Sequence, residues 1–393
     1  MVKINPLLIE NNNEFIFYNV SKKVKEIKKQ YPNQEFLSLG VGDVSKPIVA
    51  PIIKAMHEAV DDLSKMDTFK GYGASYGYNF LKEKILENEY SKFAFTLDEI
   101  YISNGTKTDS TNILELFAPN VKICIPDIMY PIYKDGAACL NHQVYTLKSN
   151  EKNDFLPQIP KKKYDIIYIC SPNNPTGICY KKSELRKWVD YALKNQAIIL
   201  YDNVYASFIE SKNVPKSIYE IKDADKVAIE FRSFSKNASF TGVRCSYYII
   251  PNKITSNINE IWKKRTINRF NGADYIAQKG AAAVYTKEAM KEIKKNIIYY
   301  KENAKLLREC FQKLNFKIYG GIDSPFIWVK IKENLSSWEY FNFLLEKLKI
   351  VVIPGIIFGN SGDKYFRVSA LAPREIIIKS IERLAKYYEK QNI

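Results

Sequence analysis

Histidine is scarce in this chain, which has only His57 and His142 among its 393 residues. Because catalytic triads and multi-histidine metal centres depend on that side chain, both kinds of site are nearly excluded. The six cysteines contain no Cys-x-x-Cys pair, and most of them stand in apolar runs. We therefore expect buried thiols, and neither a disulfide framework nor a metal site.

Long apolar segments are also missing. No run approaches the length of a membrane span, and the N-terminal residues MVKINPLLIENNNEF contain no apolar core of a signal peptide. These absences predict a cytoplasmic protein with no membrane-embedded part. Hydrophobic residues make up 46% of the chain and are spread along it, which predicts a globular protein with one large domain and a second, smaller one.

Acidic residues are outnumbered, since 59 Lys and Arg oppose 43 Asp and Glu, and the formal net charge is +16. A basic surface attracts phosphates, so nucleic-acid binding is one interpretation. However, the positive charges are mostly lysines that alternate with glutamates in helical stretches such as KKSELRKWVDYALKNQ (181–196). We expect solvated helix faces there and no nucleic-acid partner.

Short β-branched runs predict five buried strands in the middle of the chain, at residues 121–127, 164–170, 197–202, 226–231 and 245–250. Between the second and third runs, Ser183 is placed to cap a helix whose apolar residues recur at helical spacing, namely Leu185, Trp188, Val189, Ala192 and Leu193. Strand, helix and strand in this order predict a right-handed crossover. The fold class is therefore α/β, with a mostly parallel sheet flanked by helices.

The last hundred residues alternate differently. A long helix at 287–314, strands at 326–331, 350–354 and 365–371, and a closing helix at 374–390 predict a smaller α+β domain. We expect a large domain at residues 50–285 and the small domain at 286–393. The N-terminal segment, residues 1–49, is expected to pack against the small domain.

Polar residues follow the predicted strands at the place where ligands bind in parallel sheets, beyond the carboxyl ends. The segments SPNNPTG (171–177), DNVY (202–205) and RSFSKNASFTGVR (232–244) come directly after three successive strands. They supply Asn174, Asp202, Tyr205, Lys236 and Arg244. We expect these five side chains to lie together at one edge of the sheet.

An anion site is expected beside them. The segment SNGTKTD (103–109) places Gly105, Thr106 and Lys107 before a helix expected at 109–117, and a glycine turn that enters a helix presents N–H groups and the positive dipole end to a ligand. Around a phosphate dianion, these residues can be joined by Ser233, Ser235 and Arg244.

Together these groups suit a ligand with a phosphate, an aromatic ring nitrogen and an aldehyde, which is pyridoxal 5′-phosphate. Lys236 can bond to the aldehyde, and Asp202 can keep the ring nitrogen protonated. Asn174 and Tyr205 can hydrogen-bond the ring oxygen. The alternative, that Lys236 is an ordinary loop lysine, is weaker because all the motifs occur in the required order.

In this order the motifs resemble, almost end to end, the class I and II aminotransferases of fold type I. The chain is more closely similar to the LL-diaminopimelate aminotransferases in the blocks SLGVGD, KGYGASYG, SNGTKTD, YPIY, FSKNASFTGVR, FNGAD, SPFIWVK and YFRVSA. The resemblance implies transamination between an L-amino acid and a 2-oxo acid, namely LL-diaminopimelate with 2-oxoglutarate, in lysine and cell-wall precursor synthesis. It also implies a homodimer with shared active sites.

Family roles carry over to matching residues. By this resemblance Tyr133 would stack on the cofactor ring, Gly42 would line the substrate backbone, and Arg367 would bind the α-carboxylate as a bidentate fork. Tyr72 and Asn271 would reach in from the neighbouring subunit, Tyr72 towards the phosphate. The residues expected on the substrate side are Phe15, Gly42, Tyr72, Ser75, Lys107, Tyr133, Asn174, Asn271 and Arg367.

Two positions depart from the family on the substrate side. Ser75 stands where the family has an acidic residue for the distal ammonium, and Phe15 stands where it has a tyrosine for the distal carboxylate. Loss of such partners weakens discrimination, so a different amino donor is the alternative to LL-diaminopimelate. Asp274 is a hypothetical replacement for the missing carboxylate, and the competing interpretation is that it faces solvent.

Two other functions compete with transamination. A decarboxylase, β-lyase or oxidase of the same fold would share every cofactor residue, but a carboxylate held by Arg367 favours cleavage of the Cα–H bond. A non-catalytic basic regulator is the second rival. Such regulators normally carry an added DNA-binding domain, for which we expect no room in this chain.

Overall fold

The computed structural model describes residue 2, residues 16–254 and residues 257–390. The large sheet consists of β2 (Ile100–Ser103), β3 (Lys122–Pro126), β4 (Gln143–Leu147), β5 (Ile166–Cys170), β6 (Ile198–Asp202), β7 (Ala228–Ser233) and β8 (Ser246–Ile249). Their order across the sheet is β2-β8-β7-β6-β5-β3-β4. The pairs from β4 to β7 are parallel, whereas β8 is antiparallel to both of its neighbours. The predicted mostly parallel α/β sheet is therefore confirmed.

Helix α7 (Lys182–Asn195) connects the parallel neighbours β5 and β6, as expected. Its cap differs from the prediction, because Lys181 is the N-cap residue and its N–H donates to the Glu184 carboxylate at 2.7 Å. Ser183 lies inside the first turn. The prediction that Ser183 caps the helix is therefore wrong. The helix begins before Ser183, and the Glu184 side chain already accepts the hydrogen bond from the N–H group of the N-cap residue, Lys181.

Helix α5 (Thr106–Asn112) begins earlier than the predicted residue 109 and continues as a 3₁₀ turn, Ile113–Leu116. Its N-cap is Gly105, which has φ 143°. Only glycine adopts this backbone conformation without strain. The turn can therefore be tight enough for the helix to start at Thr106, at the sheet edge.

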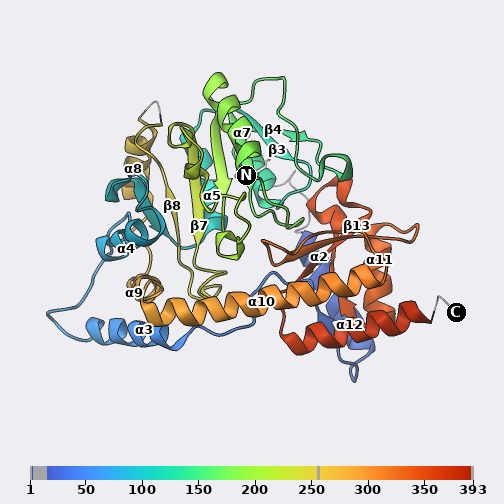
Figure 1. Cartoon of the computed structure of the whole chain (residues 1–393). Helices are drawn as coiled ribbons and strands as arrows, with labels where there is room; N and C mark the ends of the chain where they lie inside the picture. Colours follow the sequence, from blue (N-terminus) through green and yellow to red (C-terminus); the bar gives the residue numbers. More distant parts are fainter. Residues whose placement is uncertain (1, 3–15, 255–256, 391–393) are drawn as a thin grey trace.

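The remaining helices of this part of the chain are α3 (Ala50–Leu63), α4 (Asn79–Glu89), α6 (Ile132–Cys139), α8 (Ile258–Arg269), α9 (Tyr275–Ala283) and α10 (Lys287–Lys313). Figure 1 shows α10 running beneath the large sheet towards the second, smaller sheet. Its residues Ile293 and Tyr300 belong to the core of the large sheet, whereas Leu307 and Phe311 belong to the second core. One helix thus joins the two cores.

The second sheet is antiparallel and contains β9 (Ile318–Gly320), β10 (Phe326–Lys330), β12 (Ile353–Pro354) and β13 (Tyr365–Ser369), in the order β12-β13-β10-β9. It packs with α11 (Ser337–Phe343) and α12 (Arg374–Glu389). The N-terminal part contributes α2 (Ile16–Gln30) and β1 (Leu37–Ser38), which pairs with β11 (Ile350–Val351). Val20 and Ile27 of α2 lie in this second core. These contacts support the division at residues 49 and 285, which stays a prediction.

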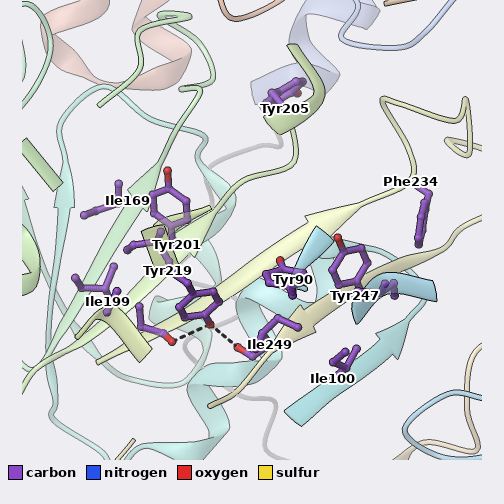
Figure 2. Close-up of a cluster of buried hydrophobic side chains, with 14 of the residues drawn as sticks. Tyr90, Ile100, Ile169, Ile199, Tyr201, Tyr205, Tyr219, Phe234, Tyr247 and Ile249 are labelled. Atoms are coloured by element: carbon purple, nitrogen blue, oxygen red, sulfur yellow. Dashed lines mark hydrogen bonds between the residues drawn. The ribbon is translucent and has the colours of Figure 1, made fainter. Parts of the chain in front are cut away.

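The core around the large sheet is rich in tyrosine. Figure 2 shows Tyr90, Tyr201, Tyr219 and Tyr247 gathered over the strands. The hydroxyl of Tyr219 lies 3.1 Å from the Ala228 carbonyl oxygen and 3.3 Å from that of Ile249. Because strand carbonyls accept from the polar tip, the ring can be buried without an unsatisfied group. Ala228 is the first residue of β7, the strand whose end leads to Lys236. Within the described ranges, no helix has the length and apolar character needed to cross a membrane.

Candidate active site

A cavity of about 450 Å³ lies where the strand ends of the large sheet meet the second sheet. It brings together twelve residues predicted from the sequence: Gly42, Thr106, Lys107, Tyr133, Asn174, Asp202, Tyr205, Ser233, Ser235, Lys236, Arg244 and Arg367. They come from the segments after β2, β3, β5, β6 and β7, from β13, and from the N-terminal strap around Gly42. The predicted convergence at one sheet edge is therefore observed.

The lysine at the end of β7 points across the cavity to the N-terminal strap. The Lys236 ammonium donates to the Gly42 carbonyl oxygen at 2.6 Å. Burial lowers the pKa of Lys236 to about 8, with the positive charges of Arg367 and Arg244 adding to the effect and Asp43 opposing it. A lysine of this kind is a neutral amine for a large fraction of its time near pH 8, which nucleophilic and proton-transfer chemistry requires.

Asp202, the last residue of β6, is buried at the floor of the cavity. Its carboxylate accepts a hydrogen bond from the Tyr133 hydroxyl and one from the Val204 N–H at 3.2 Å. Burial raises the pKa of Asp202, and in the described part of the chain no Lys, Arg or His forms an ion pair with it. A buried carboxylate without a cation suits a ligand that brings a protonated ring nitrogen.

The two tyrosines of YPIY occupy different places. The Tyr133 ring is fully buried and stacks on Tyr168, with ring centroids 4.6 Å apart. Its hydroxyl donates a hydrogen bond to the Asp202 carboxylate. Tyr130 lines the same cavity and is only half-buried. The predicted stacking of Tyr133 on a cofactor ring stays a prediction, but this geometry favours Tyr130 for that contact. Tyr133 is placed to position Asp202.

Arg367 on β13 is a buried cation beside the lysine. It donates to the Asn174 side-chain oxygen at 2.7 Å and to the Gly40 carbonyl at 2.7 Å, while its Nε has no partner. The guanidinium lies over the rings of Phe326 and Phe358, and burial lowers its pKa to about 10. No described carboxylate forms an ion pair with it. Such a group suits the carboxylate of an incoming substrate.

The residues predicted to bind an anion lie together at the start of α5, and their role stays a prediction. The Thr106 hydroxyl donates to the Arg232 carbonyl at 3.1 Å, and the Ser235 N–H donates to the Ser233 hydroxyl at 3.0 Å. A Cβ atom on Gly105 would lie 2.0 Å from Nη2 of Arg244. The guanidinium therefore occupies the space that this glycine leaves, directly against the first turn of the helix. We call Thr106, Lys107, Ser233, Ser235 and Arg244 the anion cradle.

Three predicted residues, Tyr72, Ser75 and Asn271, do not line this cavity. Tyr72 is 92% exposed. Its loop lies beside the segment around Asn271, since a Cβ atom on Gly73 would be 3.3 Å from the Asn271 carbonyl oxygen. The two segments thus lie side by side outside this cavity. Phe15 lies outside the described residues.

Asp274 has a local structural role. It is the N-cap residue of α9, and its carboxylate accepts a hydrogen bond from the Ala277 N–H at 2.7 Å. The residue is exposed and does not line the cavity. This geometry favours a helix cap over a contact with the distal end of a substrate.

The cavity also contains eight residues that sequence analysis left unassigned: Val41, Asp43, Ser110, Tyr130, Cys170, Val204, Thr241 and Phe326. Several of them are chain neighbours of assigned residues, so proximity to Gly42, Asp202 and Lys236 was an available signal. Phe326 carried no such signal. It enters the site because its ring packs edge-on against Tyr205, with centroids 5.1 Å apart.

Comparisons with known proteins identify the family of this chain. Residues 34–383 match the family model described as aminotransferase class I and II. The chain is 40% identical over 408 residues to the LL-diaminopimelate aminotransferase of Methanosphaera stadtmanae and 41% identical over 405 residues to that of Prochlorococcus marinus, in each case covering 98% of this chain and 99% of the relative. The solved L,L-diaminopimelate aminotransferase from Chlamydomonas reinhardtii matches with a TM-score of 0.93 at 34% identity, covering 98% of this chain and 99% of that one. The chain therefore has the fold type I architecture and belongs to the class I and II aminotransferases, within them to the LL-diaminopimelate aminotransferase family.

Proposed function

We propose that this protein uses pyridoxal 5′-phosphate to transfer an amino group between LL-diaminopimelate and 2-oxoglutarate. The observation that carries the proposal is a set of three charged groups around one cavity, none of which forms an ion pair within the described residues. Lys236 has a lowered pKa, Asp202 has no described cation, and Arg367 has no described carboxylate. The cofactor and an amino acid together supply the missing partners.

The residues present fit this cofactor. Lys236 would hold its aldehyde carbon, Asp202 its ring nitrogen, and the anion cradle its phosphate. Burial raises the pKa of Tyr205, so its hydroxyl stays protonated and can donate to the ring oxygen together with Asn174. When bound, the cofactor supplies a conjugated ring that accepts the electrons of the broken Cα–H bond.

The chain's own groups orient the substrate and move the proton. Arg367 would fix the α-carboxylate with two parallel hydrogen bonds, which leaves the Cα–H bond facing Lys236. Released from the aldehyde carbon when the substrate's amino group replaces it there, the Lys236 nitrogen would be a neutral amine that takes the proton from Cα and returns it to that carbon, two bonds away. Tyr133 would hold the Asp202 carboxylate in place, and Tyr130 would lie against the ring.

The substrate assignment is supported by the names of the full-length relatives. It must be reconciled with Ser75, which removes an acidic contact expected for the distal ammonium. A different amino donor is thus the second candidate. A single-turnover experiment separates the two: the purified holoenzyme is mixed separately with LL-diaminopimelate, lysine, glutamate and an aromatic amino acid, and loss of the cofactor's yellow absorbance is followed. Bleaching by LL-diaminopimelate and glutamate alone supports the proposal, whereas bleaching by another donor only would refute the substrate assignment.

We also propose a homodimer with shared sites, and cytoplasmic location stays a prediction. Tyr72 does not reach the cavity of its own subunit, and Met66 and Phe69 of the same loop are exposed large apolar side chains. Covering them with a second copy would bury apolar surface. It would also bring Tyr72 towards the partner's phosphate site.

A further inference from the structure

A buried carboxyl group lies directly behind the anion cradle and has no part in the proposed reaction. Asp109 is on α5, about one turn after Thr106, and is only 7% exposed. Its carboxylate accepts hydrogen bonds from the Ser103 hydroxyl at 2.5 Å and the Ser246 hydroxyl at 3.0 Å. No ion pair joins it to any described Lys, Arg or His. A negative charge held by hydroxyl groups alone is costly in such a place.

Two serines connect this carboxyl group to the cradle. Ser103 and Ser246 pair across β2 and β8, and Ser246 also pairs with Ser233 across β8 and β7. The Ser103 and Ser246 hydroxyl oxygens lie 2.6 Å apart. Three serines therefore stand in one row at the sheet edge. Asp109 contacts two members of this row, Ser103 and Ser246, and the third member, Ser233, belongs to the anion cradle.

The charged and titratable groups around Asp109 do not neutralise it fully. Arg244, from the loop before β8, lowers its pKa, but burial dominates and raises the pKa of Asp109 to about 7. Cys245 and Tyr248 face it from the same segment, and both are themselves raised in pKa by burial and by its charge. The neighbouring helix α6 contributes Asp135, whose pKa is raised by burial, although the positive charge of Lys107 in the anion cradle acts to lower it. Near neutral pH, Asp109 is thus poised between its two charge states.

We propose that Asp109 becomes protonated from solvent when a phosphate dianion binds in the anion cradle. Like charges raise one another's pKa, so a dianion on the other side of Arg244 favours the protonated carboxyl group. The acid O–H then donates to a neighbouring serine oxygen, no second negative charge remains behind the phosphate, and Arg244 is left to the ligand. This inference rests on the proposed function, because the anion is taken to be the cofactor's phosphate.

Pyridoxamine 5′-phosphate is the probe that tests it, since it carries the phosphate but no aldehyde for Lys236. The full-length protein freed of cofactor, and its Asp109→Asn variant, are titrated calorimetrically near pH 7.5 in two buffers of different protonation enthalpy. Because about a quarter of the Asp109 groups are already protonated at this pH, we expect the wild type to take up roughly 0.5 to 0.75 proton more than the variant. As pH rises above 7, the affinity of the wild type for pyridoxamine 5′-phosphate should also fall more steeply than that of Asp109→Asn.

Ser246→Ala serves as a second variant in case Asp109→Asn does not fold. It removes a hydrogen bond that favours the charged carboxylate, so Asp109 should be more protonated before binding and the proton uptake should shrink. Equal uptake in the wild type and the variants would overturn the inference while leaving the proposed function intact. A wild-type protein that does not bind the probe would instead overturn the proposed function.

Discussion

Lys236 is expected to react as a neutral amine at a lower pH than an exposed lysine. Burial has lowered its pKa from 10.5 to about 8, so the reactive form is gained as pH rises through about 8. The rate at which the cofactor-free protein bonds to pyridoxal phosphate should rise across that range, which stopped-flow absorbance between about pH 6 and pH 10 would show. A midpoint near that of an ordinary lysine would contradict the assignment, and Lys236→Ala should not bond at all.

Arg367→Lys tests the carboxylate site. A lysine keeps the charge but cannot make two parallel hydrogen bonds. The variant should therefore lose about 1.5–3 kcal/mol of transition-state stabilisation, so kcat/KM for the amino acid should fall roughly 10- to 150-fold. We expect this loss to include a higher KM, and the cofactor spectrum should not change. Arg374→Lys is the matched control, because that arginine pairs with Glu302 away from the cavity. Equal kinetics in the two variants would remove Arg367 from the site.

At the residue scale, the chemistry of the site could be predicted further than its orientation. Lys236, Asp202 and Asn174 follow β-branched strands, and strand ends meet in space, so their convergence follows from sequence pattern. Both Tyr130 and Tyr133 line the cavity, but which of them donates to Asp202 and which stays half-buried could not be predicted. It depends on the register of α6 and on the stacking of Tyr133 against Tyr168, a contact between residues far apart in the chain.

At the scale of single elements, the start of α5 depends on Gly105. Gly105→Ala would add a Cβ atom where Arg244 lies and would force a strained backbone, at a cost of about 1–3 kcal/mol. We expect weaker binding of pyridoxal phosphate, measured as Kd by fluorescence titration. Gly242→Ala is the control, because no atom lies within 4 Å of the added Cβ atom there. An unchanged Kd in Gly105→Ala would show that the cradle tolerates the displaced guanidinium.

The cap of α9 separates two roles for Asp274. If it is only a cap, Asp274→Ala should lower the free energy of unfolding by about 1 kcal/mol, and Asp274→Asn, which also caps, should not. Neither variant should then change the ratio of KM values for LL-diaminopimelate and glutamate. If the carboxylate binds a distal ammonium, both variants should raise KM for LL-diaminopimelate alone. Thermal denaturation and steady-state kinetics on the same preparations decide between these results.

At the scale of the whole molecule, the two cores could be anticipated from the change in strand and helix pattern near residue 286. The structure adds that α10 belongs to both cores, through Tyr300 on one side and Leu307 on the other. Sequence pattern cannot show this, because one apolar stripe satisfies either partner equally well. Likewise, the exposed Tyr72 gives no local sign of the second subunit that we propose it contacts.

Mixing two inactive variants tests whether active sites are shared between subunits. Lys236→Ala removes the reacting lysine, and Tyr72→Ala removes the residue expected to cross to the partner's site. Each variant alone should have little activity. In a mixed dimer, one site combines an intact Lys236 with the intact Tyr72 of the other chain, and random assortment should restore about a quarter of wild-type activity.

The restored activity should appear only after the subunits have been dissociated and allowed to reassociate, and sedimentation should show dimers throughout. Simple addition of the two parental activities would mean that Tyr72 acts within its own subunit or not at all. Because Tyr72 is 92% exposed and outside its own cavity, complementation would have no explanation other than a site built from two chains.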